Sequence, residues 1–308
     1  MIENVTKCLK KGELCFPFWC FLVIITMGEI MIKLFATDLD GTLLYDGNGS
    51  HHNTNLTETR VDLINQLNQK GIHFAIATGR DYFTRHKISE QIGFSIDAIG
   101  SNGCCVVVNE KLIVNHTLKW DVMFKLHEEL VKIGFPFELL TIDSEGRHAM
   151  TNPKSHVFFV FNHMKANGEI RSFTEVPLLE WAKRSEFEPN KIVIVVEEHR
   201  DEMMDKLWPF IDKYNLDMFY SGPIYIEVMP KNVNKASGIE VLMRYYNIKE
   251  NEVAVIGDSM NDAAMLSRFQ NSYVMSHASS DVLKLGKKVV ESVDEALMEV
   301  LGISHADI

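Results

Sequence analysis

Residues 34–44 read LFATDLDGTLL, an apolar run that leads into two aspartates, Asp38 and Asp40, and then Gly41. An apolar run stopped by a glycine turn is typical of a buried parallel strand that ends in a loop. Open α/β sheets bind their ligands in such loops. Because alternate side chains of a strand share a face, we expect the two carboxylates to point the same way. Their repulsion requires a cation, a shared proton or a substrate to offset it, unless the segment is an ordinary Asp-Gly turn.

The length and composition place the chain among globular proteins with a substantial core. With 308 residues, it is expected to form two domains or one domain with a large insertion. Its hydrophobic content of 46% and charged content of 24% are ordinary for a soluble protein. The net charge of −11 argues against a general nucleic-acid binder, although small phosphorylated ligands remain compatible with it. The five cysteines form no Cys-x-x-Cys pair, which favours free thiols in a reducing compartment, and we expect a cytoplasmic protein.

Residues 1–30 differ from the rest of the chain. Lysines precede an apolar run from Cys15 to Met27, which resembles the basic and hydrophobic regions of a signal peptide. The run is interrupted by Pro17, is short for a membrane span, and has no Ala-x-Ala-like cleavage site after it. We expect Met31 to be the natural start and residues 1–30 to be an upstream extension, with no stable membrane association. A membrane anchor or export signal is the alternative.

The first half of the chain alternates strand and helix signals. A helical spacing between Thr57, the expected N-cap, and Gly71 is followed by an apolar strand at 73–78. A short strand at 98–100 and a hairpin over 104–114 come next. Strands that alternate with helices predict a doubly wound, mostly parallel, Rossmann-like α/β sheet.

The middle of the chain has a different texture. Helical segments at 121–133 and 199–214 alternate with strand-like runs at 135–142, 156–161, 191–197 and 218–220. After residue 224 the chain shows further strand signals at 224–229, 252–256 and 272–275, the last of which is expected to complete the sheet. We therefore predict a core formed by 31–115 and 224–308 and an inserted α+β cap domain over 116–223.

Three strand-like runs end in polar loops, and these loops should meet at one edge of a parallel sheet. They are Asp38-x-Asp40, Thr78-Gly79-Arg80 and the GDSMND stretch at 257–262. Lys235 lies at the start of the helix that precedes the last of them. Carboxylate oxygens suit a hard cation such as Mg²⁺. Together with a lysine, this cation would hold the oxygens of a phosphoryl group.

These loops and Lys235 resemble the sequence motifs of the haloacid dehalogenase (HAD) superfamily. The stretch DLDGTL at 38–43 is similar to the first motif of that superfamily. Thr78, Lys235 and the stretch at 257–262 match the second, third and fourth motifs in order. The ATGR and SNG loops, with an inserted domain between the second and third motifs, resemble the Cof-type branch. Members of that branch are phosphatases of sugar phosphates and similar small molecules, with a large α/β cap of type IIB.

The resemblance implies a role for each matching residue. Asp38 would attack phosphorus and become an aspartyl phosphate, and Asp40 would first protonate the leaving oxygen and then deprotonate water. Lys235 would neutralise charge. The metal would be held by side-chain oxygens of Asp38 and Asp258 and by the backbone carbonyl of Asp40.

The resemblance also implies supporting residues. Thr78 and the amide of Gly79 would bind phosphoryl oxygens, and Asn261 would reach the phosphoryl group or Lys235. Asp262 would orient the metal shell, and Arg80 and Asn102 would face the cap and substrate.

Five of these residues also have a structural interpretation that involves no ligand. Thr78 could satisfy its own backbone, and Lys235 could be a solvated lysine at a helix start. Asp262 could be an acid in the first turn of a helix, and Arg80 and Asn102 could form a salt bridge and a cap.

We therefore expect a Mg²⁺-dependent phosphatase that hydrolyses small phosphorylated metabolites, with sugar phosphates as the favoured class. A phosphotransferase or phosphomutase that uses the same residues is one alternative. A non-catalytic phospholigand-binding protein is another, but such a protein has no need of both Asp38 and Asp40. The sequence leaves the individual substrate and the oligomeric state open.

Overall fold

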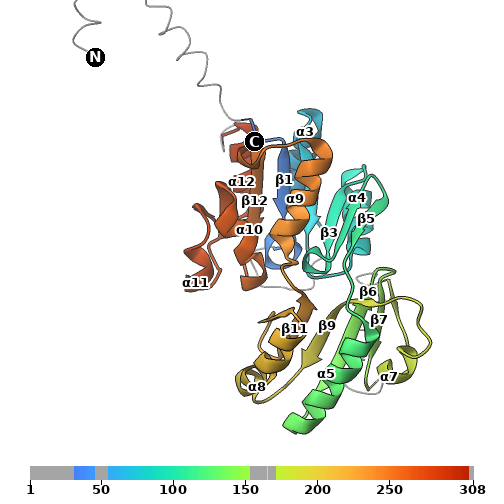
Figure 1. Ribbon diagram of the computed structural model, residues 1–308. Helices are drawn as coiled ribbons and strands as arrows, with labels where there is room; N and C mark the ends of the chain where they lie inside the picture. Colours follow the sequence, from blue (N-terminus) through green and yellow to red (C-terminus); the bar gives the residue numbers. More distant parts are fainter. Residues whose placement is uncertain (1–30, 46–54, 153–164, 166–170, 305–308) are drawn as a thin grey trace, which may run out of the picture. The chain divides into compact units, whose positions relative to one another are not determined.

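The computed structural model describes residues 31–45, 55–152, 165 and 171–304. Two predictions, the one on residues 1–30 and the strand at 156–161, lie outside the described residues. Within the described part, the strands form an eight-stranded sheet and a six-stranded sheet (Figure 1).

The eight-stranded sheet has the order β14-β13-β12-β1-β2-β3-β4-β5. All neighbouring pairs from β14 to β3 are parallel, and the two hairpin strands β4 and β5 are antiparallel. The predicted doubly wound, mostly parallel core is therefore confirmed. The strands are β1 (Leu34–Thr37), β2 (His73–Ala77), β3 (Asp97–Gly100), β4 (Cys105–Val108), β5 (Lys111–Asn115), β12 (Val253–Gly257), β13 (Asn271–Met275) and β14 (Lys288–Val290).

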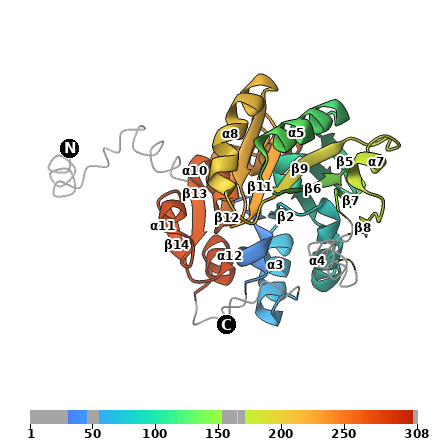
Figure 2. The same cartoon turned by 90° about the horizontal axis from the view of Figure 1, so that it is seen from below.

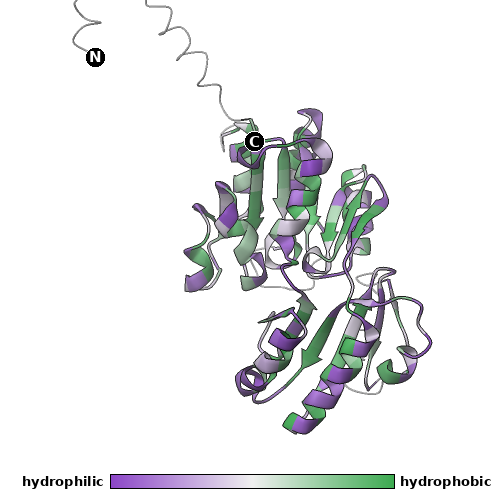
Figure 3. Ribbon diagram, in the orientation of Figure 1, coloured by the Kyte–Doolittle hydropathy of each residue, from purple (hydrophilic) through white to green (hydrophobic). Residues whose placement is uncertain are grey.

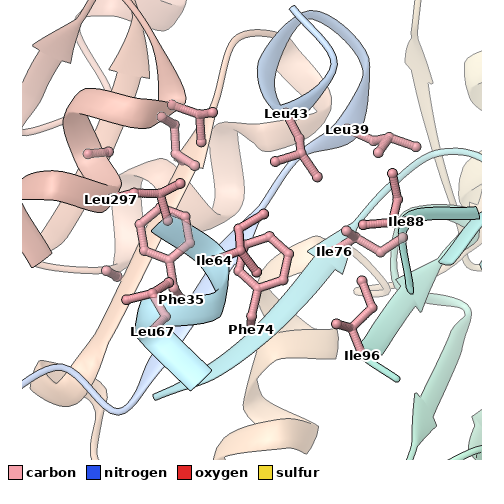
Figure 4. Close-up of a cluster of buried hydrophobic side chains, with 14 of the residues drawn as sticks. Phe35, Leu39, Leu43, Ile64, Leu67, Phe74, Ile76, Ile88, Ile96 and Leu297 are labelled. Atoms are coloured by element: carbon pink, nitrogen blue, oxygen red, sulfur yellow. The ribbon is translucent and has the colours of Figure 1, made fainter. Parts of the chain in front are cut away.

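Helices cover both faces of this sheet. One face packs against α3, α4 and α12 through a large apolar cluster, part of which Figure 4 shows around Phe35, Phe74 and Ile76. The other face packs against α9 and α10 through a second cluster. Alternation along β1 explains this, because Phe35 belongs to the first cluster and Leu34 and Ala36 to the second. The helices are α3 (Glu58–Gln69), α4 (Arg85–Ile92), α9 (Lys235–Tyr246), α10 (Ala263–Arg268), α11 (Ser280–Leu283) and α12 (Val293–Leu301).

The six-stranded sheet has the order β10-β11-β9-β6-β7-β8 and is antiparallel except for its last pair. Helices α5 and α8 contact each other and pack on one face of it (Figure 2). In Figure 3, α5 carries hydrophilic and hydrophobic residues in alternation, as an amphipathic helix on a sheet does. The elements are α5 (Trp120–Ile133), β6 (Glu138–Asp143), β7 (Arg147–Met150), β8 (Ser172–Phe173), α7 (Leu178–Trp181), β9 (Pro189–Val195), α8 (Arg200–Lys213), β10 (Leu216–Tyr220) and β11 (Tyr225–Pro230).

Two sequence assignments are corrected by these pairings. The sequence places the strand at 224–229 in the core domain, but β11 pairs with β9 and β10 in the six-stranded sheet. The strand at 272–275 was expected to complete the core sheet, but β14 pairs beyond it. The first segment is recognisable as a strand, but its pattern does not specify its partner. The strand β14 is too short to give a recognisable pattern. The other boundaries of the predicted domains stay predictions.

Among the described residues, no helix combines the length and the apolar character needed to cross a bilayer.

Candidate active site

The loops that follow β1, β2 and β12 lie next to one another because these three strands are adjacent and parallel. Their register is level, since Thr37 of β1 pairs with Ile76 on one side and Ile256 on the other. The amide of Asp38 continues the ladder and donates to the carbonyl of Ile256 over 2.9 Å. The nucleophile predicted from the sequence thus leaves the centre of the sheet at its carboxyl edge.

Lys235 joins two of the predicted acidic residues. It is the first residue of α9, whose N-cap Asn234 accepts a hydrogen bond from the amide of Ser237. Its ammonium donates to Oδ1 of Asp38 and, over 2.6 Å, to Oδ1 of Asp262. The side chain of Lys235 is fully buried, so the alternative of a solvated lysine is wrong.

Asp262 organises the turn that carries Asp258. Its Oδ2 accepts hydrogen bonds from the amides of Asp258 and Ser259, both over 3.0 Å. The hydroxyl of Thr42 donates to Oδ1 of Asp258 over 2.9 Å and so connects the loop after β1 to the loop after β12. The loops can approach this closely because residue 41 is glycine: a Cβ there would lie 2.6 Å from Oδ2 of Asp258.

Negative charge exceeds positive charge at this site. Burial raises the pKa of Asp38 well above its ordinary value, and the carboxylates of residues 262, 258 and 40 raise it further, against the effect of Lys235. Burial and Asp262 likewise raise the pKa of Asp258 to about 6. The surrounding carboxylates raise the pKa of Lys235 despite its burial. One ammonium therefore faces several carboxyl groups, and an added cation would relieve their repulsion.

Three of these carboxyl groups are close enough to share a metal ion. One oxygen each from Asp38, Asp258 and Asp262 lie within 4.8 Å of one another. All three offer oxygen atoms, the ligands that hard divalent cations prefer. The set could therefore hold such a cation, as the sequence predicted for Asp38 and Asp258.

The predicted acid–base residue, Asp40, points to a different partner. Its carboxylate receives two hydrogen bonds from Arg80, over 2.9 Å from Nε and 2.5 Å from Nη2. The side chain of Asp40 is 46% exposed, whereas that of Arg80 is 12% exposed. Arg80 thus forms the salt bridge that was its structural alternative, and it does so with the proposed general acid.

The remaining predicted residues surround the same edge. The hydroxyl oxygen of Thr78 accepts from the amide of Arg80 over 3.1 Å, so its structural alternative is observed and its phosphate-binding role stays a prediction. Asn102 lies against Gly79, where a Cβ would be 3.3 Å from the Asn102 side-chain oxygen. Asn261 donates to that oxygen over 3.4 Å and accepts from the hydroxyl of Ser259 over 2.7 Å.

Two buried charged residues near this edge were missed in the sequence. Glu227 of β11 accepts from Nδ2 of Asn102 and from Lys191 of β9, each over 2.9 Å. Both charged side chains are nearly buried, at 6% and 5% exposed. The available signal was a single acid within the apolar run YIEVM and a single lysine before IVIVV. A lone charge inside a buried strand requires a partner.

Comparison with known proteins identifies the family. The family model described as haloacid dehalogenase-like hydrolase matches residues 35–301. The chain belongs to this family. A candidate phosphatase of Streptococcus pyogenes serotype M6 is 27% identical over 291 residues. The match covers 89% of the present chain and 97% of the streptococcal protein.

Two further similar proteins are also named phosphatases, and one of them has a solved structure. The 5-amino-6-(5-phospho-D-ribitylamino)uracil phosphatase YbjI of Escherichia coli is 24% identical over 270 residues, 83% of the hydrolase and 89% of that protein. The solved structure of the HAD subclass IIB sugar phosphatase BT4131 superposes with a TM-score of 0.72 at 20% identity, covering 88% of the hydrolase and 100% of that chain. The predictions of a HAD phosphatase and of a Cof-type, subclass IIB fold are confirmed at this level.

Proposed function

We propose that the chain is a Mg²⁺-dependent phosphatase that hydrolyses phosphate monoesters of small metabolites, with sugar phosphates as the main substrate class. The observation that carries the proposal is the contact of Lys235 with Asp38 beside Asp258 and Asp262. A buried carboxylate that is held by an ammonium, next to a cluster with surplus negative charge, suits covalent phosphoryl transfer better than mere ligand binding.

In the first step, an oxygen of Asp38 forms a bond to phosphorus while the bond from phosphorus to the alcohol oxygen breaks. The proton that the leaving oxygen needs comes from Asp40. Because Asp40 is paired with Arg80 in the structure, this pair has to open as substrate enters. In the second step, Asp40 takes a proton from water, whose oxygen attacks the phosphorus of the aspartyl phosphate. Inorganic phosphate leaves and Asp38 is regenerated.

The phosphoryl oxygens are placed by groups on the neighbouring loops. Lys235 contacts Asp38 and can stabilise negative charge first on the carboxylate and then on the phosphoryl group. We assign the amide of Gly79, the hydroxyl of Thr78 and the amide of Asn261 as further donors, since their loops border the same edge.

The donor set fits magnesium. Bound Mg²⁺ would neutralise charge on the phosphoryl oxygens and on the carboxylates that hold it. We assign Asp38 and Asp258 as its side-chain ligands and the backbone carbonyl of Asp40 as a further one. Asp262 is the less suitable ligand, because its oxygens already accept from Lys235 and from two backbone amides. It orients the others.

Phosphate release from a panel of phosphorylated compounds tests the proposal. The panel contains hexose and pentose phosphates, phosphorylated sugar alcohols and the substrate named for the E. coli relative. We expect release that depends on Mg²⁺ and stops after chelation. Folded protein that releases no phosphate from any member near neutral pH would refute the proposal. Analysis of the alcohol acceptors for newly formed phosphate esters separates hydrolysis from phosphotransfer.

A further inference from the structure

The amide of Asn102 is the point where three parts of the chain meet. It lies over Gly79 in the loop after β2, receives a hydrogen bond from Asn261 in the loop after β12, and donates to Glu227 in β11 of the six-stranded sheet. Asn102 itself is 2% exposed. The Asn102 side chain therefore connects Glu227 to two loops of the candidate active site.

Glu227 determines which way this amide faces. A carboxylate accepts hydrogen bonds only, so Nδ2 of Asn102 must point to Glu227. The Asn102 oxygen then accepts from Nδ2 of Asn261, while the amide group as a whole lies against Gly79. This in turn leaves the Asn261 oxygen for the hydroxyl of Ser259. The orientation of both amides thus follows from one acceptor.

The backbone at Asn102 needs such support. Ser101 and Asn102 have φ of 48° and 53°, the left-handed region that non-glycine residues adopt at a cost. The backbone amides of both residues are bonded to the loop after β2, with Ser101 donating to the carbonyl of Arg80 and Asn102 to that of Thr78. The side-chain bond to Glu227 adds a tie to the other sheet. The strained turn is therefore held from both sides.

Lys191 keeps Glu227 available as an acceptor. Its ammonium donates to the same oxygen, Oε2, that receives Asn102. Both partners are almost fully buried, and a buried carboxylate without this counter-charge would be costly. The ion pair is thus part of the arrangement and is not a surface contact.

We propose that Glu227 is a positioning residue for the phosphoryl-binding loops, acting from the six-stranded sheet through the amides of Asn102 and Asn261. The proposal rests on the proposed function, in that Asn261 and Gly79 are assigned to the phosphoryl group. Because the loops that Glu227 positions bind the phosphoryl group common to all substrates, its effect is independent of the alcohol that leaves.

A matched pair of double variants isolates the acceptor. Lys191→Met with Glu227→Gln removes both charges but keeps an oxygen that can accept from Asn102. Lys191→Met with Glu227→Leu removes both charges and the acceptor. We expect the Gln variant to stay within about 3-fold of the wild type in kcat/KM, and the Leu variant to lose about 10-fold or more. The loss should be equal for p-nitrophenyl phosphate and for a sugar phosphate.

Equal activity of the two double variants would overturn the proposal, as would a loss confined to the sugar phosphate. Glu227→Asp provides a second route should the Leu variant not fold. It keeps the charge but withdraws the acceptor by one methylene, and it should give the same uniform loss. Glu129→Gln is the control, because Glu129 is ion-paired with Lys132 on the exposed side of α5 and should leave kcat/KM unchanged.

Binding of inorganic phosphate in the presence of Mg²⁺, measured by calorimetry, separates this proposal from the proposed function. A wild type that binds phosphate without releasing it from any ester overturns the proposed function alone. Glu227 is then judged by phosphate affinity, which should be about 10-fold weaker in the Leu than in the Gln double variant. A wild type that neither binds phosphate nor releases it overturns both proposals.

Discussion

Gly41 is the residue that lets the loop after β1 approach the carboxylate of Asp258. Its φ of +79° is strained for any other residue, and an added Cβ would lie 2.6 Å from Oδ2 of Asp258. We predict that Gly41→Ala raises the Mg²⁺ concentration for half-maximal phosphate release by about tenfold or more, which corresponds to about 1.4 kcal/mol.

Gly71→Ala is the matched control for that prediction. Gly71 has a similar φ of +73°, but nothing lies within 4 Å of its missing Cβ. Its substitution should cost about 1 kcal/mol of unfolding free energy through backbone strain and leave the Mg²⁺ requirement unchanged. If both variants needed equally more Mg²⁺, the contact with Asp258 would not be the cause.

Asp38 is predicted to be indispensable to turnover but not to folding. In Asp38→Asn the amide oxygen can still accept from Lys235, while the nucleophilic carboxylate is gone. We expect kcat to fall by at least about 10³-fold with an unchanged circular dichroism spectrum. Asp121→Asn, at an exposed ion pair with Lys125, should keep the wild-type kcat. Full activity of Asp38→Asn would show that the nucleophile is another residue.

At the scale of elements, we predict that the buried His148 of β7 makes the six-stranded sheet sensitive to acid. Burial lowers the pKa of His148 to about 4, and its Nδ1 lies 3.2 Å from the carbonyl of Ser172. The unfolded chain, with a histidine pKa near 6.5, binds the proton more readily than the folded chain. The stability that the neutral imidazole contributes is therefore present above about pH 6.5 and is lost as the pH falls toward 4.

We predict that His148→Gln flattens this dependence. Between pH 7 and pH 5 the wild type should lose about 2 kcal/mol more unfolding free energy than the variant, as measured by urea denaturation. His116→Gln, at an exposed position, should behave as the wild type does. Parallel pH profiles for the wild type and His148→Gln would mean that His148 does not carry the effect.

The sequence predicted most elements, because their signals are local. Thr57 caps α3 as expected, its hydroxyl accepting from the amide of Arg60, and Asn234 caps α9 just before Lys235. The sheet to which β11 belongs was not predictable in this way. The alternation along this strand shows which of its residues are buried. It does not show that the strand pairs with the preceding strand β10 and with β9 rather than with the core sheet.

The same distinction holds for the site. Asp38, Lys235 and Asp258 could be predicted because each lies at the end or start of a recognisable element, and the structure brings them together. The roles of Glu227 and Lys191 could not, because they depend on the pairing of β9 with β11 and on a contact between β11 and the turn that carries Asn102. Arg80 was predicted to be near the substrate, but its pairing with Asp40 depends on side-chain packing that motif spacing does not describe.

For the whole molecule, we expect metal binding to increase stability, because a cation would relieve the repulsion among the carboxylates of the site. A ligand that binds only the folded chain stabilises it by about 2.7 kcal/mol at a concentration of one hundred times its Kd. We predict that MgCl₂ raises the Tm by several degrees compared with NaCl of equal ionic strength, because screening alone cannot replace a cation seated between Asp38 and Asp258.

Asp258→Asn should increase the stability of the metal-free protein and reduce the stabilisation that Mg²⁺ provides. Without Mg²⁺ it should be more stable than the wild type at pH 7.5, by up to about 3 kcal/mol, because a carboxyl whose pKa is raised to about 6 opposes folding once it is ionised. With Mg²⁺ it should gain little, because a ligand is lost. Asp281→Asn, at an exposed ion pair with Lys284, should shift as the wild type does. A gain for Asp258→Asn as large as that of the wild type would place the cation elsewhere, since the stabilisation would then not depend on the carboxylate that the fourth motif contributes.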